Sequence, residues 1–356
     1  MEGGRENYLK KAGAGWVKLF WNFLTQGLQM GGYRMKPTLV FLLWIGWAAQ
    51  GVGEVLATPG PLGHPEVTPT VTRQDWRTVE KILGRQGQTQ GDMLKVSFTR
   101  TDLNVLVSGT PIEPELALTT WFTFKPLSRQ TLVTGEMVLL DQEVPKVMVP
   151  LVRYGFQVDS LHDPLINESP SVKVLRIQAK GSRAWLAEVL REALYTSGTP
   201  QVPPERKKPS VTPEDWSKVE AILGPGTVEN RVLEYDIPLE EPIRENGMDF
   251  PAFMGMGSVL RLQKTCDHIA SAGSFLLTKE QVKPVVEALT EEHFAITGVQ
   301  NATLTESPRL FQVTYWVQGK TEETAKGLKA VIEKIDLSGQ EPTPSETPED
   351  SNQKGF

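Results

Sequence analysis

The sequence predicts an α+β protein built from two tandem repeated domains, each an antiparallel sheet packed by helices. One observation is internal similarity, since VTRQDWRTVEKILG at residues 71–84 matches VTPEDWSKVEAILG at residues 211–224. The other is the order of local patterns, in which several strand-like runs of β-branched and aromatic residues follow one another with few helices between them. That order is typical of antiparallel sheets covered by helices.

The similarity extends along each unit. Residues 131–158 parallel residues 269–296 at an offset of 138 positions, and the first pair of segments has an offset of 140. An offset of this size corresponds to one domain per copy. We assign the first domain to residues 71–194 and the second to residues 211–336.

Each domain is predicted to open with an amphipathic helix. Thr72 would cap the first helix, Trp76 would lie on its apolar face as a core residue, and Gly84 would end it. Thr212 and Pro213 are expected to begin the helix of the second copy. The segments that follow predict strands at LKVSFTR, NVLVSG, LALTTWFTFKPL and TLVTGEMVLL, a helix around residues 144–151, a hairpin of FQVDSLHD and VKVLRIQAKG, and a last helix at SRAWLAEVLREAL.

Three further segments are predicted to lie outside the domains. Residues 195–210 are rich in Pro and charge, which is typical of an exposed linker, and residues 58–70 form a similar spacer. Residues 337–356 are too polar to bury a core, so we expect a disordered tail.

Residues 1–57 are interpreted as an N-terminal leader with a signal peptide. From Met35 the sequence has a basic start, an apolar run and small residues before a predicted cleavage site after Ala57, the three-part pattern of a secretory signal. We expect cleavage rather than use of the apolar run as an anchor. Residues 1–34 do not fit this pattern, so Met35 is the predicted true start. The alternative is an interfacial helix with Trp16 and other aromatic residues on one side.

Composition bears on several classes of function. The chain has 356 residues, of which 39% are hydrophobic and 22% charged, as in ordinary globular proteins. A net charge of -6 disfavours a nucleic-acid partner, which needs clustered Lys and Arg. The single cysteine, Cys266, excludes an internal disulfide and a cysteine-based zinc cage. No nucleophile elbow, phosphate loop, dinucleotide fingerprint or zinc-protease motif occurs, which favours binding over catalysis.

Three blocks of the first copy, GTPIEPELALTTWFTFKPL, TGEMVLLDQEV and HDPLINESPSVKVLRI, resemble in their order the LppY/LpqO family of exported lipoproteins, a domain of unknown function. The resemblance covers residues 71–335 in two copies and implies export. The chain departs from a lipoprotein because no cysteine follows the apolar core of the leader. Acylation at that place is therefore excluded.

The resemblance also implies a set of histidines, because the family pattern resembles H-N-H-L-L-x-E-x-P followed by a strand with another His. The matching positions are His162, Pro164, Glu168, Pro170 and Arg176 in the first copy, and Gln300, Ala302, Glu306, Pro308 and Thr314 in the second. One histidine of the family's six remains, and the permanent charge of an arginine stands where a metal ligand is expected. We predict no metal and no cofactor.

This stretch holds the candidate ligand-binding residues. They are His162, Asp163, Glu168, Arg176, Gln300 and Glu306. Glu168 and Glu306 also have a structural interpretation, a Glu-Ser-Pro turn between two strands, and His162 has one as a solvated loop residue. Cys266–His268 reads Cys-Asp-His, but a lone cysteine is weak evidence for a metal or a reactive thiol. No catalytic residue is assigned.

These observations predict an exported two-domain binding protein, secreted or in the cell envelope, whose partner is a small molecule or an envelope component. A membrane contact is expected only through an uncleaved signal. Two alternatives stay open, an extracytoplasmic hydrolase or lyase that uses Glu168 with His162, and a structural envelope component. The sequence leaves open the oligomeric state and whether the two domains pack as a pseudo-dimer.

Overall fold

The computed structural model describes residues 73–202, 215–239, 241–265 and 268–337, and before them the paired short strands β1 (Gln29–Met30) and β2 (Tyr33–Arg34). The rest of the predicted leader, the spacer, the tail beyond residue 337 and most of the linker lie outside the described residues. Their assignment and the domain boundaries stay predictions. The described residues from 73 to 337 belong to one compact unit. None of the helices in the described residues has the length and hydropathy that a membrane span requires.

The first repeat forms a six-stranded antiparallel sheet in the order β3-β4-β7-β8-β11-β9. Its elements are α3 (Arg73–Leu83), β3 (Gln88–Gln90), β4 (Met93–Thr99), β7 (Thr119–Pro126), β8 (Thr131–Leu140), α5 (Val144–Arg153), β9 (Gln157–His162), β11 (Val172–Gly181) and α6 (Arg183–Thr196).

The second repeat forms an equivalent sheet in the order β12-β13-β16-β17-β20-β18. Its elements are α7 (Ser217–Leu223), β12 (Thr227–Glu229), β13 (Val232–Pro238), β16 (Gly257–Thr265), β17 (His268–Thr278), α8 (Lys279–Glu291), β18 (Ala295–Asn301), β20 (Leu310–Lys320) and α9 (Thr321–Leu337). The prediction of two tandem α+β repeats, each an antiparallel sheet with helices, is confirmed.

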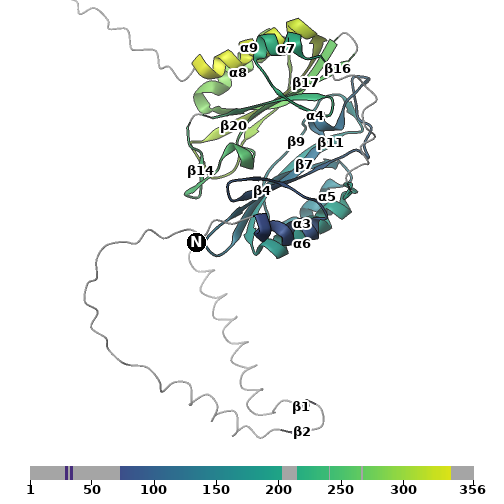
Figure 1. The fold of residues 1–356 in the computed structure, drawn as a ribbon, viewed down its shortest axis with the longest axis vertical. Helices are drawn as coiled ribbons and strands as arrows, with labels where there is room; N and C mark the ends of the chain where they lie inside the picture. Colours follow the sequence, from purple (N-terminus) through teal and green to yellow (C-terminus); the bar gives the residue numbers. More distant parts are fainter. Residues whose placement is uncertain are drawn as a thin grey trace, which may run out of the picture. The chain divides into compact units, whose positions relative to one another are not determined.

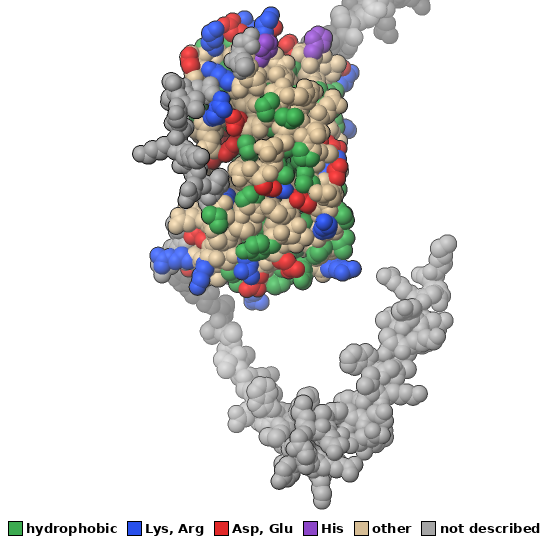
Figure 2. All heavy atoms as spheres, turned by 90° about the vertical axis from the view of Figure 1, so that its right-hand side faces the viewer, with side chains coloured by type: hydrophobic (Ala, Val, Ile, Leu, Met, Phe, Trp, Pro, Cys, Tyr) green, Lys and Arg blue, Asp and Glu red, His purple; other side chains and the backbone are tan. Residues whose placement is uncertain are grey.

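The two sheets stack face to face, with helices on both outer sides (Figure 1). In the first repeat Phe122, Met137 and Leu175 pack with Trp76 in one core under α3, α5 and α6, and the second repeat has an equivalent core around Phe275. Alternate residues of the same strands face the other sheet. Charged side chains gather towards the two ends of this unit, over the helices (Figure 2).

The first helix of the second repeat begins later than the sequence predicts. Pro213 is expected in its first turn, but α7 starts at Ser217 with Trp216 at the N-cap. The Asp215 carboxylate accepts a hydrogen bond from the Ser217 amide at 3.0 Å and so satisfies one of the free donors of the helix start. Trp76 and Trp216 are 1% and 4% exposed, which confirms that both are core residues.

A short arm leaves each repeat and lies on the sheet of the other. Arm 1, residues 105–118, and arm 2, residues 243–256, each contain two strands and a helical turn. Their elements are β5 (Leu106–Val107), β6 (Thr110–Pro111) and α4 (Pro114–Ala117) in arm 1, and β14 (Arg244–Glu245), β15 (Met248–Asp249) and η1 (Ala252–Met254) in arm 2. Each arm also pairs with a short strand of its own repeat, β10 (Glu168–Ser169) or β19 (Glu306–Ser307).

The two arms make equivalent contacts, each with a strand of the other repeat. The Gln263 side chain on β16 donates to the Pro111 carbonyl at 2.9 Å and accepts from the Glu113 amide at 2.7 Å. Reciprocally, the Lys125 ammonium on β7 donates to the Asp249 carbonyl. Lys125 and Gln263 are equivalent positions at the offset of 138, and so are Pro111 and Asp249. The two repeats therefore pack as a pseudo-twofold dimer, which answers the question that the sequence left open.

Apolar side chains fill the space under both arms. Leu116 of arm 1 shares a core with Val138 of β8 and Trp316 of β20, and Met254 of arm 2 shares one with Leu132 of β8. Full burial of a side chain of this size contributes about 1.5–3 kcal/mol. Because each of these cores takes residues from both repeats, neither repeat closes its inner face alone.

Gly255 sets how closely arm 2 approaches the first sheet. Its φ is +79°, and a Cβ at this position would lie 2.4 Å from Cη2 of Trp121. We expect Gly255→Ala to lower the free energy of unfolding by about 2–3 kcal/mol, because an unfavourable φ is combined with a steric clash. Chemical denaturation of the purified chain measures the loss.

Gly247 of the same arm is the matched control. Its φ is +77°, but no atom lies within 4 Å of an added Cβ. Gly247→Ala should lower the free energy of unfolding by about 1 kcal/mol, because only the unfavourable φ contributes and no clash is added. Equal losses at the two positions would contradict the role assigned to the close approach at Gly255.

Candidate functional site

A row of polar side chains crosses the inner face of the first sheet. Trp121 on β7 and Glu136 on β8 are direct cross-strand neighbours, and so are Glu136 and Arg176 on β11. The equivalent row of the second sheet is Val259, Ser274 and Thr314. One sheet thus brings an aromatic residue and two charges to the interface, whereas the other brings small neutral side chains.

Arg176 and Glu136 form an ion pair in which the guanidinium is buried and the carboxylate is partly exposed. Nη1 of Arg176 lies 2.9 Å from Oε1 of Glu136, and Nε1 of Trp121 donates to Oε2 of the same carboxylate at 3.1 Å. Nη2 of Arg176 donates to the Gly255 carbonyl of arm 2 at 3.3 Å, and Arg176 is 1% exposed. A buried charge is costly unless it is paired and hydrogen-bonded, so Arg176 depends on Glu136.

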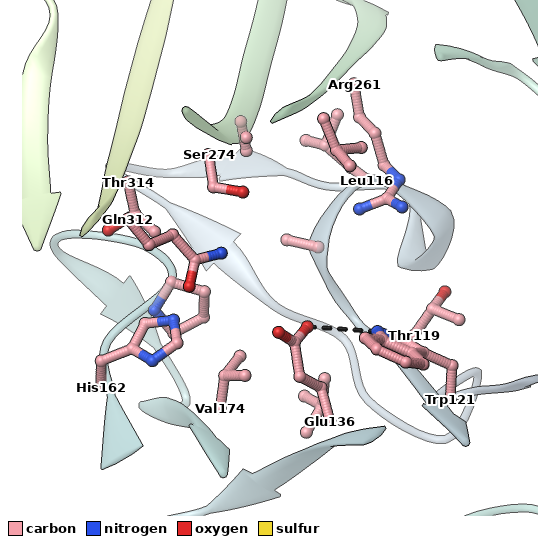
Figure 3. A pocket seen from close by; sticks show the side chains of 16 residues that line it. Leu116, Thr119, Trp121, Glu136, His162, Val174, Arg261, Ser274, Gln312 and Thr314 are labelled. Carbon is pink, nitrogen blue, oxygen red and sulfur yellow. Dashed lines mark hydrogen bonds between the residues drawn. The ribbon is translucent and has the colours of Figure 1, made fainter. Parts of the chain in front are cut away.

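A cavity lies beside this pair, between the two sheets, and both repeats line it (Figure 3). Its volume is about 80 Å³, which is room for a molecule of a few heavy atoms, since one water needs roughly 10–15 Å³. In Figure 3 the Glu136 carboxylate, the Ser274 hydroxyl and the Gln312 amide point towards its centre. The polar side chains of the wall are those of Thr119, Trp121, Glu136, His162, Arg261, Ser274, Gln312 and Thr314.

His162, at the end of β9, belongs to the cavity wall. Its Nδ1 is buried and has no hydrogen-bond partner among the described residues. Burial lowers the pKa of the imidazole; the charge of Glu136 opposes this shift, that of Arg176 adds to it, and that of Asp163 opposes it. The ring is therefore neutral at pH 7, and its free nitrogen can donate to or accept from a bound molecule.

Arg261 on β16 approaches the cavity from the second sheet (Figure 3). Its Nε donates to Oε2 of Glu234 at 2.5 Å. On the first sheet, which faces Arg261, the Lys95 ammonium lies 4.6 Å from the centre of a Trp121 ring. Burial, followed by the charge of Arg261, lowers the pKa of Lys95. The cavity wall therefore carries Arg261, which is paired with Glu234, on the side of the second sheet, and Glu136, which is paired with Arg176, on the side of the first.

The chain matches the family described as Domain of Unknown Function (DUF1259) twice, over residues 77–196 and 217–334. It belongs to the DUF1259 family. The two matched segments are the two repeats, so each DUF1259 domain supplies one sheet and one wall of the cavity. A comparison with curated proteins gives no match.

Similarity of the DUF1259 pair to solved structures is low. The trimeric shell protein MSM0271 from the RMM microcompartment is 14% identical, covering 59% of this chain and 85% of that chain at a TM-score of 0.15. The trimeric bacterial microcompartment shell protein PduB is 11% identical (72% and 94%, TM-score 0.17), and TP0453 is 11% identical (61% and 81%, TM-score 0.17). TM-scores this low carry no argument about fold or function.

Three of the predicted site residues of the DUF1259 pair lie at or next to the cavity. His162 lines it, Arg176 holds Glu136 of its wall, and Gln300 donates through Nε2 to Oε1 of Gln312, another wall residue, at 3.4 Å. His162 is thus no solvated loop residue. It ends strand β9, is half-buried and lines the cavity between the two sheets.

The other three predicted residues have structural contacts and are not part of the wall. The Glu168 carboxylate accepts from the Val172 amide at 3.4 Å, and the Glu306 carboxylate accepts from the Leu310 amide at 3.0 Å. Glu168 lies on β10 and Glu306 on β19, and each of these short strands pairs with a strand of an arm. The two Glu-Ser-Pro segments are therefore paired strands as well as turns. Asp163 forms an ion pair with Lys173.

A second buried polar network joins the DUF1259 domains, and sequence reasoning missed it. Nε2 of Gln178 donates to Oδ1 of Asp159 at 3.1 Å and to Oε1 of Glu245 in arm 2 at 2.7 Å. Thr305 donates to the same Glu245 oxygen at 3.1 Å. Burial raises the pKa of Asp159, against the opposing hydrogen bonds from Gln157 and Gln178.

The sequence analysis did not single out several wall residues, among them Glu136, Trp121, Arg261 and Gln312. The available signal was alternation, which is clear on β16, where Arg261 and Gln263 alternate with leucines, but not on β8, where Glu136 shares its face with Leu132 and Val138. Polar residues at such positions are ordinarily taken as solvent-facing. Here they face a second sheet.

The structure leaves the metal prediction untested. Among the described residues no group of three or more His, Cys, Asp and Glu side chains could hold a metal ion. Cys266 and Asp267 lie outside the described residues, and His268 begins β17.

Removal of one partner of the ion pair is the first test of this site. Arg176→Met should lower the free energy of unfolding by about 3 kcal/mol or more, because it leaves the Glu136 carboxylate at the interface without its cation. The double variant Arg176→Met/Glu136→Gln should recover much of this loss. A double variant that is less stable than the sum of the two single losses would contradict a charge-based pairing.

His162 makes stability depend on pH. Its pKa is lowered from the ordinary 6.5, so below pH 6.5 the unfolded chain binds more protons than the folded one and stability falls as the pH falls. His162→Gln, which copies Gln300 of the second repeat, should reduce the loss of stability between pH 7 and pH 5 in denaturation experiments. A His162→Gln chain that loses as much stability between pH 7 and pH 5 as the original chain would contradict this role of His162.

Proposed function

We propose that this protein is an exported binding protein whose two DUF1259 domains together hold one small carboxylic acid in the cavity between their sheets. The observation that carries the proposal is the buried, unbonded Nδ1 of His162 in a polar wall to which both repeats contribute. A buried nitrogen without a partner costs about 1–3 kcal/mol. A bound molecule that hydrogen-bonds to it removes this cost.

The chemistry of the wall supports the class of ligand. Arg261 offers a guanidinium for a carboxylate, and Ser274 and Gln312 offer neutral hydrogen-bonding groups beside it. Glu136, on the opposite side, can accept from a hydroxyl or an ammonium group. With a volume of about 80 Å³, these features favour a short hydroxy acid or amino acid.

Binding is favoured over catalysis by the state of the acidic groups. Both oxygens of Glu136 already accept hydrogen bonds, from Arg176 and Trp121, so this carboxylate is poorly suited to take a proton from a substrate. Glu168, the residue that a hydrolase or lyase would use, accepts from the Val172 amide and is not a wall residue. No specific observation favours the hydrolase or the purely structural alternative.

Export rests on the leader pattern of residues 35–57 and on the resemblance of the repeats to the LppY/LpqO family. In this proposal the signal is removed after Ala57, and the mature protein begins at Thr58. N-terminal sequencing of protein recovered outside the cytoplasm tests the cleavage. Recovery of the whole chain from the cytoplasm would contradict export without touching the ligand proposal.

The ligand proposal is tested by thermal denaturation and calorimetry with glycolate, lactate, glycine and malate, each compared with the alcohol or amine that lacks the carboxylate. A ligand at 100 times its Kd stabilises by about 2.7 kcal/mol. Arg261→Gln should weaken binding by about 10- to 100-fold, the effect of one charge-assisted hydrogen bond.

Arg244→Gln is the matched control, because Arg244 is 65% exposed, pairs with Asp249 and is not a wall residue. It should bind the acid as the original chain does. Equal stabilisation by the acids and their neutral counterparts, or equal binding by the Arg261 and Arg244 variants, would rule out carboxylate recognition at this cavity.

A further inference from the structure

An aromatic groove runs along the outer, helical face of the first repeat. Tyr154 at the end of α5, and Trp185 and Tyr195 of α6, line it, and they are 44%, 36% and 65% exposed. Val189 of α6 lies between them in the same groove. Exposed aromatic side chains gathered in one groove are typical of contact surfaces.

The helical face of the second repeat is an internal comparison for this groove. Each of the three aromatic positions has an equivalent 138 residues later, at the end of α8 or on α9. These equivalents are Glu292, Glu323 and Glu333, and all three are exposed. The same backbone thus carries three carboxylates on one repeat and three aromatic rings on the other. Contact with solvent explains three exposed carboxylates, but it does not explain three exposed aromatic rings.

The groove also carries charges of both signs along α6. Glu188, Arg191 and Glu192 line it together with the aromatic residues. Carboxylates in the middle of the groove disfavour an anionic lipid surface. A surface with charges of both signs can pair with a second copy of itself about a two-fold axis, which brings residue i of one copy to residue j of the other and the reverse.

We propose that two copies of the chain pair through this groove, with α6 of one copy antiparallel to α6 of the other. When the two helices cross near Val189, Arg191 of each copy faces Glu188 of the other, and the exposed rings cover one another. The occupant is therefore a second copy of the same chain. The groove lies on the helical side of the first sheet, so pairing leaves the cavity between the sheets open.

Sedimentation velocity of the full chain over a micromolar range tests the pairing. The original chain should form a dimer in a concentration-dependent way, and Tyr195→Glu, which copies Glu333, should weaken the dimer by about tenfold or more. Val228→Glu is the matched control, because Val228 is 49% exposed but lies on the second repeat. It should leave the dimer unchanged.

A charge exchange identifies the partner as a second copy. Glu188→Arg and Arg191→Glu should each weaken the dimer, and the double variant should restore it, because the two ion pairs are then rebuilt with opposite polarity. Far-ultraviolet circular dichroism checks that each variant is folded. A monomeric original chain, or a double variant no better than the single ones, would overturn the proposal. So would a monomer that binds vesicles of anionic phospholipid, since the groove would then be a membrane contact.

Discussion

Arg176 carries a permanent charge into the space between two sheets, and Glu136 makes this possible. The carboxylate accepts from the guanidinium on one oxygen and from Trp121 on the other, so neither charge is left without a partner. Nη2 of Arg176 donates to the backbone of arm 2 at Gly255, while its buried Nε has no hydrogen-bond partner among the described residues. The ion pair, the arm and the cavity wall are therefore parts of one arrangement, and the position of each depends on the other two.

The exchange of arms explains why the two DUF1259 domains form one body. Each sheet buries one face under its own helices, and the other face needs a cover. That cover is the other repeat, and the arms add apolar side chains and backbone hydrogen bonds at its margins. A single repeat of this design would expose the whole inner face of its sheet, including the charged row.

The repeat architecture could be predicted from the sequence because similarity at a fixed offset needs no knowledge of packing. Trp76 and Trp216 could likewise be assigned to the core from spacing alone. The cavity could not be predicted, because Glu136, Arg261 and Gln312 belong to three different strands and meet only when two sheets stack. The later start of α7 at Ser217 depends on Asp215 as a local hydrogen-bond acceptor, and sequence spacing favoured an earlier residue. Glu168 and Glu306 could be paired from the sequence because Glu-Ser-Pro occurs in both repeats. In the structure each carboxylate accepts a hydrogen bond from the backbone amide four residues later, so the repetition reflects a shared structural contact.

The pseudo-twofold arrangement joins two halves whose sequences differ. In a dimer of two identical chains, every residue at the axis is present twice, so an acid at the position of Glu136 would be matched by a second acid at the equivalent position. In a covalent tandem the two halves are free to differ, and here Glu136 is matched by Ser274 and His162 by Gln300. A cavity at a broken symmetry axis can have two different ends. It can therefore hold a molecule with a head and a tail in a single orientation.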